Sequence, residues 1–245
     1  MISRNTVKFV KSLELKKNRK RERLFVAEGP KVVGDLLSAG FRPRDVFSVT
    51  DRPDATLVSA EELARISFLQ HPQEVLALFE IPDSSQQPLA IESVQGRLLL
   101  ALDGVQDPGN VGTIIRIADW FGIDTIVCSM ETADAYSPKV VQATMGSIAH
   151  VHIIYSSLLE FLQNLPAGFP VYGTLLDGSD IYRQPLSAEG VIVMGNEGNG
   201  ISEAVRSMVS RRLLIPNFNS SGNTAESLNV AIATAVVCSE FRRRG

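Results

Sequence analysis

The sequence has few of the residues on which metal sites and disulfide bonds depend. It contains two cysteines and three histidines in 245 residues. Cys128 and Cys238 are far apart and form no C-x-x-C pair, which favours buried reduced thiols over a redox or metal role. His71, His150 and His152 show no spacing typical of metal ligands. The sequence therefore argues against a catalytic metal.

Long apolar runs and the common nucleotide-binding motifs are also absent. No stretch approaches the roughly 18 apolar residues that a membrane span needs, and the N-terminus is polar and basic rather than a signal core. We therefore expect a cytoplasmic protein without membrane contact. Gly195, Gly198 and Gly200 form G-x-x-G-x-G, which is neither the dinucleotide-binding order nor a P-loop. An ordinary nucleotide-binding α/β enzyme is thereby disfavoured.

Charge is unevenly distributed along the chain. The net charge of −3 argues against a generally basic nucleic-acid binder, yet nine basic residues and only two acidic ones lie between Arg4 and Arg23. This basic segment can neutralise several phosphates, although charge runs are also common on solvated helix faces. Its candidate RNA contacts are Lys16, Lys17, Lys20 and Arg21.

Residues 1–82 are typical of a small α/β domain. Apolar residues near helical spacing, with cations between them, predict an amphipathic basic helix over residues 6–17. The other predicted elements are strands over 24–28, 46–49, 56–58 and 75–79, and helices over 31–38 and 61–66. Residues 81–93 are polar, contain two prolines and show no period. We therefore predict a linker at 83–95, followed by a second domain over 96–245.

The second domain alternates strands and helices, which predicts a parallel sheet covered on both faces. Strands are predicted over 98–102, 125–128, 151–154, 171–175, 192–194 and 213–215. Helices are predicted over 111–121, from Ser137-Pro138 to near Gly146, after Ser156 or Ser157, after Ser202, and over 225–242. Ligands of such sheets collect beyond the carboxyl ends of the strands, so function is expected in the loops there.

Three motifs occupy those loops. They are Asn110-x-Gly112-x-x-x-Arg116-x-Ala118, Gly195-x-Glu197-Gly198-x-Gly200, and Ile215-Pro216 followed by Ser227-Leu228-Asn229-Val230. Together they resemble the motifs of the SpoU (TrmH) family, which are RNA ribose 2′-O-methyltransferases of the SPOUT class. The resemblance covers roughly residues 95–245. A shorter match, Phe25-Val26-x-Glu28-Gly29 before a helix, resembles the L30e-like RNA-binding domain of many SpoU proteins.

The resemblance implies an α/β fold in which a small L30e-like domain precedes a parallel-sheet SPOUT domain with a trefoil knot. It implies S-adenosylmethionine as the methyl donor, with Gly195, Ile215 and Leu228 as cofactor contacts and Thr174 as a further candidate. It also implies a homodimer paired through the last helix. The apolar face expected there comprises Val230, Ala233, Val236, Val237 and Phe241.

Arg116 is the central catalytic candidate, because it is a cation near Asn110 at a loop-to-helix junction. A guanidinium holds its proton above pH 12, so we expect it to orient phosphate and stabilise a developing alkoxide rather than act as a base. The alternatives are a plain phosphate clamp and a salt bridge to Glu197. The polar motif residues expected to position the arginine and the ribose are Asn110, Glu197, Ser227 and Asn229. Each of these four is also compatible with a turn or a helix cap.

The function predicted from these residues is methyl transfer from S-adenosylmethionine to a ribose 2′-hydroxyl of structured RNA. The appended N-terminal domain favours rRNA over tRNA. The alternative is a catalytically silent RNA-binding protein of the same fold, against which the intact motif residues argue. Two departures from the family pattern are a longer loop over residues 218–226 and Ala231 at a position where the family commonly has serine.

Overall fold

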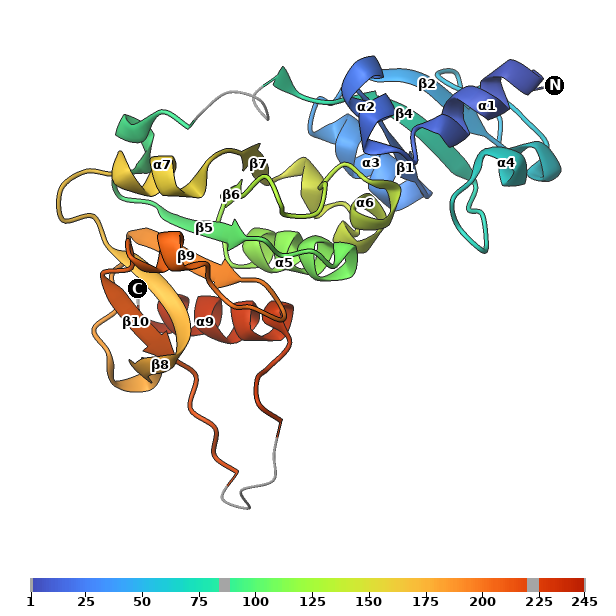
Figure 1. Ribbon diagram of the computed structural model, residues 1–245. Coiled ribbons are helices and arrows are strands. Elements are labelled where there is room, and N and C mark those ends of the chain that lie inside the picture. Colours follow the sequence, from blue (N-terminus) through green and yellow to red (C-terminus); the bar gives the residue numbers. More distant parts are fainter. Residues whose placement is uncertain (1, 84–88, 220–224, 245) are drawn as a thin grey trace. The chain divides into compact units, whose positions relative to one another are not determined.

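The computed structural model describes residues 2–83, 89–219 and 225–244 (Figure 1). The chain forms two compact units, one of Met1–Asp83 with Asp134–His150, the other of Ser84–Ala133 with Val151–Gly245. This division differs from the linear one predicted, because Asp134–His150 belongs with the N-terminal residues. Within the first unit, Tyr136 packs on Phe25 with ring centroids 5.1 Å apart. Part of the predicted linker, residues 84–88, lies outside the described residues.

The first unit is a four-stranded sheet with helices. Its elements are α1 (Arg4–Ser12), α2 (Lys16–Glu22), β1 (Leu24–Glu28), α3 (Pro30–Ser38), β2 (Pro43–Ser48), β3 (Thr56–Leu57), α4 (Ala60–Ile66), β4 (Val75–Glu80), α6 (Pro138–Thr144) and the 3-10 turn η3 (Ser147–Ala149). The strand order is β1-β4-β2-β3, antiparallel except for the β2–β3 pair. The predicted small α/β unit is therefore present.

The basic segment forms two helices instead of the single helix predicted over residues 6–17. Helix α1 ends at Ser12, and Leu15 is extended with φ −87° and ψ 127° before α2 begins. Leu13 is fully buried in the core of the unit together with Val10 and Leu24. The chain breaks between buried Leu13 and the start of α2, and Leu15 at the break is 51% exposed. Tertiary packing overrides local periodicity here.

The second unit is a six-stranded parallel sheet, as predicted. Its elements are η2 (Ile91–Val94), β5 (Leu98–Asp103), α5 (Pro108–Trp120), β6 (Thr125–Cys128), β7 (His152–Tyr155), α7 (Leu158–Gln163), β8 (Val171–Asp180), η4 (Ile181–Arg183), β9 (Gly190–Gly195), α8 (Glu203–Arg206), β10 (Arg211–Leu214) and α9 (Val230–Arg244). The strand order is β10-β8-β9-β5-β6-β7, and every pair is parallel. Strands β5 and β9 are buried along their whole length, as central parallel strands require.

Helices cover both faces of this sheet. Leu99 and Ala101 of β5 pack with Phe161 of α7 and Val205 of α8 in one apolar cluster. Helices α5 and α9 pack against each other and against β6 and β9 (Figure 1). The motif loops follow the carboxyl ends of the strands that these helices cover.

Helix α9 begins at Val230, five residues later than predicted, because residues 225–229 are not helical. Its apolar face also differs from expectation. Val230, Val237 and Phe241 are buried inside their own chain, and Phe241 packs edge-on against Tyr172 at 4.8 Å between ring centroids. Those three residues are therefore not available for pairing with another subunit.

Both cysteines are buried and unpaired, as predicted, and burial raises the pKa of each thiol. None of the helices in the described part of the chain combines the length and apolar character that crossing a bilayer requires. Within residues 2–83, 89–219 and 225–244, no group of three or more histidine, cysteine or acidic side chains is arranged to hold a metal ion.

Candidate active site

The candidate site lies at the carboxyl edge of the six-stranded sheet, where β5 and β9 end side by side. Asp103 is the register partner of Gly195, so the loops that follow these two residues leave the sheet at the same place. The loop after β5 leads into the first turn of α5, which carries Asn110, and the loop after β9 carries Glu197. Two motifs separated by almost ninety positions in the chain thus meet through strand pairing.

Glu197 is held by donors from the first motif loop. Its carboxylate accepts hydrogen bonds from the backbone N–H groups of Gln106 and Asp107, each at 3.2 Å, and from Asn110 Nδ2 at 3.0 Å. Partial burial alone would raise the pKa of Glu197, but these hydrogen bonds outweigh it and lower the pKa. The side chain is therefore a weak base and a well-held anion at neutral pH.

Asn110 extends this arrangement to the third motif. Its Oδ1 accepts a hydrogen bond from Asn229 Nδ2 at 2.9 Å. Asn229 Oδ1 in turn accepts from the backbone N–H groups of Ala231 and Ile232, at 2.9 and 3.3 Å, and so caps α9. The cap role, one of the alternatives from the sequence, is formed, and the same side chain also contacts Asn110. Glu197, Asn110 and Asn229 form a continuous hydrogen-bonded chain across all three motifs, which we call the motif relay.

Asn196 and Asp103 support the relay, and neither was predicted from the sequence. Asn196 Oδ1 accepts from the backbone N–H groups of Gly198 and Asn199, and its Nδ2 donates to the Gly104 carbonyl at 2.7 Å. Asp103 accepts from the Ser202 N–H at 2.7 Å. An asparagine before Glu-Gly is a turn signal. Only the pairing of β5 with β9 shows that Asn196 also joins the loop after β9 to the loop after β5.

Arg116 projects from α5 and is exposed. Among the described residues it has no hydrogen-bond or ion-pair partner, and the carboxylate of Glu197 is occupied by Asn110 and the backbone. The salt bridge to Glu197, one of the alternatives considered from the sequence, is therefore not formed. The guanidinium remains free to contact a phosphate or a ribose.

Three of the candidate cofactor residues lie on or directly after the neighbouring strands β9, β8 and β10, and Leu228 lies just before α9. Gly195 ends β9, and a Cβ there would come within 2.3 Å of the Gly200 backbone, so glycine is required for the tight turn. Thr174 on β8 donates to the Val193 carbonyl at 3.1 Å. Ile215, directly after β10, is half-buried, whereas Leu228 is 51% exposed. Ser227 is also exposed. The lengthened loop falls partly outside the described residues, at 220–224.

The basic segment of the first unit presents four of its nine cations on α2. Lys16, Lys17, Lys20 and Arg21 are all exposed. Arg19 is different, because it is 2% exposed, donates to the Leu13 and Glu14 carbonyls, and pairs with Asp134 at 2.5 Å. Arg19 therefore stabilises the fold and is not available to phosphates.

The lowered pKa of Glu197 predicts a pH effect on stability. Because this pKa is lower in the folded chain than in the unfolded one, the carboxylate stabilises the fold above about pH 4.3, and the contribution is lost as the pH falls through the lowered value. We expect the Tm of Glu197→Gln to fall less steeply than that of the wild type between about pH 5 and pH 3. The effect is modest because the side chain is exposed. The control is Glu131→Gln, at an exposed glutamate, and its Tm should fall with pH as steeply as that of the wild type. If the Tm of Glu197→Gln falls with the same slope as those two, the prediction is contradicted.

Two family models match the chain. The SpoU rRNA Methylase family matches residues 97–239, and the MRM3-like substrate binding domain matches residues 4–77. These two ranges coincide with the region of the three motifs and with the small N-terminal α/β unit.

Similar proteins carry related descriptions. The 23S rRNA (guanosine(2553)-2′-O)-methyltransferase RlmP of Bacillus subtilis is 30% identical over 96% of this chain and 95% of its own. A protein of the TrmH family from Porphyromonas gingivalis has a TM-score of 0.86 and 42% identity, with both chains fully covered. An AdoMet-bound rRNA methyltransferase from Sinorhizobium meliloti has a TM-score of 0.85 and 31% identity, covering 100% of this chain and 97% of its own.

Proposed function

The chain belongs to the SpoU rRNA methylase family, and on that premise we propose that it transfers a methyl group from S-adenosylmethionine to a ribose 2′-hydroxyl of ribosomal RNA. The relatives with rRNA 2′-O-methyltransferase names, and a similar structure with AdoMet bound, support both the reaction and the donor. The match of the N-terminal unit to a substrate-binding domain supports RNA as the acceptor.

The motif relay is the observation that carries this proposal. Hydrogen bonds of 3.0 and 2.9 Å join Glu197 to Asn110 and Asn110 to Asn229. A chain that had kept the fold and lost turnover would have no need to keep three polar side chains from distant loops in one hydrogen-bonded arrangement. This favours an active enzyme over the alternative of a catalytically silent RNA-binding protein.

The protein contributes to this reaction mainly by aligning the ribose oxygen with the methyl group and the sulfur. A methyl group on a sulfonium is displaced in line, and the leaving group departs neutral. We assign Arg116 to the phosphate next to the target ribose and to the charge that develops on its oxygen. Glu197 has a lowered pKa and is therefore suited to positioning rather than to proton abstraction. The hydrogen bond between Asn110 and Asn229 joins the N-terminal ends of α5 and α9. Ser227 is assigned to the ribose because it is exposed beside Asn229 in sequence.

The motif loops offer apolar surface and space for close backbone approach, which suit the binding of a nucleoside methyl donor. Exposed Leu228 and half-buried Ile215 offer apolar surface for an adenine ring, and Gly200, with φ +69° and open space on its Cβ side, lets the backbone approach closely. Gly195 and Thr174 belong to the adjacent strands. S-adenosylmethionine, when bound, supplies the electrophilic methyl group. We also propose that the second unit of this chain contains the trefoil knot of the family. We propose a cytoplasmic location for the protein, where its rRNA substrate would be modified.

The experiment that tests the function is incubation of the full chain with ribosomal RNA and with tRNA in the presence of labelled methyl donor. Methyl incorporation into rRNA at a ribose 2′-oxygen, mapped by its resistance to alkaline cleavage, is the expected result. Incorporation into tRNA alone, or into a base, would overturn the proposal. A chain that binds RNA and transfers no methyl group would favour the catalytically silent alternative.

We further propose a homodimer that pairs through α9 together with α5. These helices pack against each other, and each leaves a large apolar side chain in solvent, with Ile232 55% and Trp120 86% exposed. Ala233 and Val236 of the predicted face remain half-buried beside Ile232 on α9. Such exposed apolar groups on adjoining elements are typical of interaction sites.

Replacing Ile232 with glutamate is expected to dissociate the homodimer, because a charge would be buried at the interface. Light scattering at micromolar concentration should give about twice the chain mass of 26.7 kDa for the wild type and the single-chain mass for the variant. Leu176→Glu on β8, at an apolar site that is 75% exposed, should leave the mass unchanged. A wild-type chain that is monomeric under these conditions would refute the pairing.

A further inference from the structure

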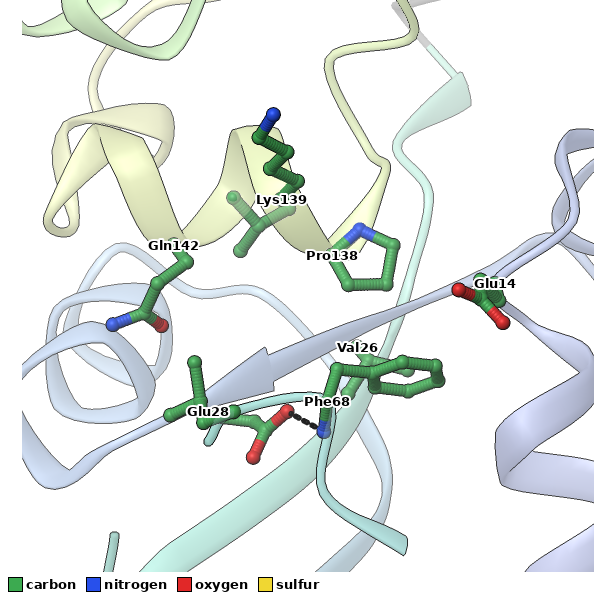
Figure 2. Close-up of a pocket in the computed structure, with 9 residues that line it drawn as sticks. Glu14, Val26, Glu28, Phe68, Pro138, Lys139 and Gln142 are labelled. Atoms are coloured by element: carbon green, nitrogen blue, oxygen red, sulfur yellow. Dashed lines mark hydrogen bonds between the residues drawn. The ribbon is translucent and has the colours of Figure 1, made fainter. Parts of the chain in front are cut away.

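The first unit contains a cavity of about 270 Å³ whose lining includes none of the residues assigned to methyl transfer. Its walls come from the segment between α1 and α2, from β1, from the segment that follows α4, and from α6. Figure 2 shows Pro138 and Gln142 projecting from α6 toward Glu28 and Phe68 on the opposite wall. The volume is close to the lower limit for small-molecule sites, which suits a single flat ring system.

Glu28 is a buried carboxylate at the wall of this cavity. It is 6% exposed, and its two oxygens accept hydrogen bonds from the Ser67 hydroxyl and from the Phe68 N–H, the latter at 2.7 Å. Both donors are neutral, and no ion pair to Glu28 is formed among the described residues. An ionised carboxylate has about four lone-pair positions, so acceptor capacity remains for donors that enter the cavity.

Burial of this charge is costly unless donors satisfy it. Desolvation raises the pKa of Glu28, while the hydrogen bonds from Ser67 and Phe68 and the charge of Lys11 partly oppose that rise. A ligand that brings two N–H groups to the carboxylate would remove the remaining cost. Two exposed side chains of opposite charge, Glu14 and Lys139, also line the cavity, and the buried carboxylate of Glu28 disfavours a phosphate there.

Phe68 supplies an aromatic wall. The ammonium of Lys11 lies 4.6 Å from the centroid of this half-buried ring, where its charge interacts with one face. Pro138 and Gln142 stand across the cavity, so a planar ring fits between these side chains and Phe68 while its edge points at Glu28 (Figure 2). Unpaired RNA bases are recognised in this way, by stacking on aromatic side chains and by hydrogen bonds to their edges.

We propose that this cavity binds one unpaired guanine base of the substrate RNA, with two of the base's N–H groups donating to Glu28 and its ring lying against Phe68. Guanine presents two adjacent N–H donors on its Watson–Crick edge. Adenine and cytosine present a donor beside an acceptor, and uracil presents one donor between two carbonyl oxygens that a carboxylate would repel. The inference rests on the proposed function, because it takes RNA as the substrate of this chain.

The test compares single-stranded oligouridine RNAs that carry one central guanine, adenine or inosine, bound to the full chain and followed by fluorescence anisotropy. We expect the guanine RNA to bind on the order of tenfold to a hundredfold more tightly than the adenine RNA. Inosine lacks the 2-amino group and should lie between them. Phe68→Leu should weaken binding of all three, because it removes the stacking surface.

Glu28→Gln should abolish the preference for guanine, since an amide presents one acceptor in place of the paired oxygens. The matched control is Glu80→Gln, at an exposed glutamate that ends β4 of the same sheet, and it should retain the preference. A guanine preference that survives in Glu28→Gln would overturn the assignment. Equal affinity of the wild-type chain for the guanine and adenine RNAs would overturn the proposal. This measurement needs no variant, so the test holds even if a variant misfolds.

The two proposals fail in distinguishable ways. A chain that methylates rRNA but shows no base preference refutes the guanine pocket and leaves the methyltransferase function intact. A chain that prefers guanine yet transfers no methyl group refutes the function and leaves the pocket standing. In an active chain, Glu28→Gln should raise KM for RNA and leave kcat within a few-fold.

Discussion

Replacing Arg116 with alanine is expected to lower the turnover number by a factor on the order of 10² to 10³ while S-adenosylmethionine affinity stays within a few-fold of the wild type. Losses of this size are typical when one donor to a developing charge is removed. The guanidinium has no partner among the described residues, so its removal leaves no buried group unsatisfied and the fold should persist. Single-turnover methyl transfer and calorimetric titration of the donor measure the two quantities.

Two further variants sharpen this experiment. Arg116→Lys keeps the charge and loses the planar pair of donors, so its turnover should lie between those of the wild type and the alanine variant. Arg183→Ala removes an exposed arginine from η4 of the same unit and should leave turnover near that of the wild type. Loss of S-adenosylmethionine binding in Arg116→Ala would show that this residue shapes the cofactor site. The assignment of Arg116 to the RNA rather than to the cofactor would then be wrong.

Removing the four exposed cations of α2 is expected to weaken RNA binding on the order of a hundredfold at physiological salt. Each cation that neutralises a phosphate releases a counterion, so the slope of log K against log salt should become shallower by up to about 3 for single-stranded RNA. The variant replaces Lys16, Lys17, Lys20 and Arg21 with alanine. Affinity for S-adenosylmethionine should not change, because the motif loops belong to the other unit.

The control for this variant removes the same charge elsewhere in the first unit. Its four substitutions to alanine are at Arg42, Arg44, Arg52 and Arg65. This control should bind RNA with a salt slope close to that of the wild type. If the α2 variant and the control behave alike, the basic segment contributes only general charge, and α2 is a solvated helix face, as the alternative from the sequence held.

Several elements could be predicted from local sequence because their signals are local. Ser59, Ser137 and Ser157 cap α4, α6 and α7. The sequence placed the start of α6 at Ser137-Pro138 and the start of α7 after Ser156 or Ser157, because a serine before a helical pattern is a start signal. Helix α5 begins earlier than predicted, at Pro108 behind the cap Asp107. Proline at the first helical position is a known start signal, so this boundary was available from the residues. The break between α1 and α2 was not, because it follows from packing of Leu13 against the sheet.

The sequence by itself determined the parallel sheet and most of its strands and helices, because apolar runs, caps and glycine turns each extend over only a few residues. It also predicted that the site lies at the carboxyl ends of the strands. The tertiary structure alone decided which loops meet. Pairing of β5 with β9 brings Asn110 to Glu197, and the late start of α9 places Asn229 within 2.9 Å of Asn110. It also placed Asp134–His150 in the first unit, where α6 closes the cavity over Glu28. Such contacts join distant parts of the chain, and their energy depends on packing rather than on the period of any one segment.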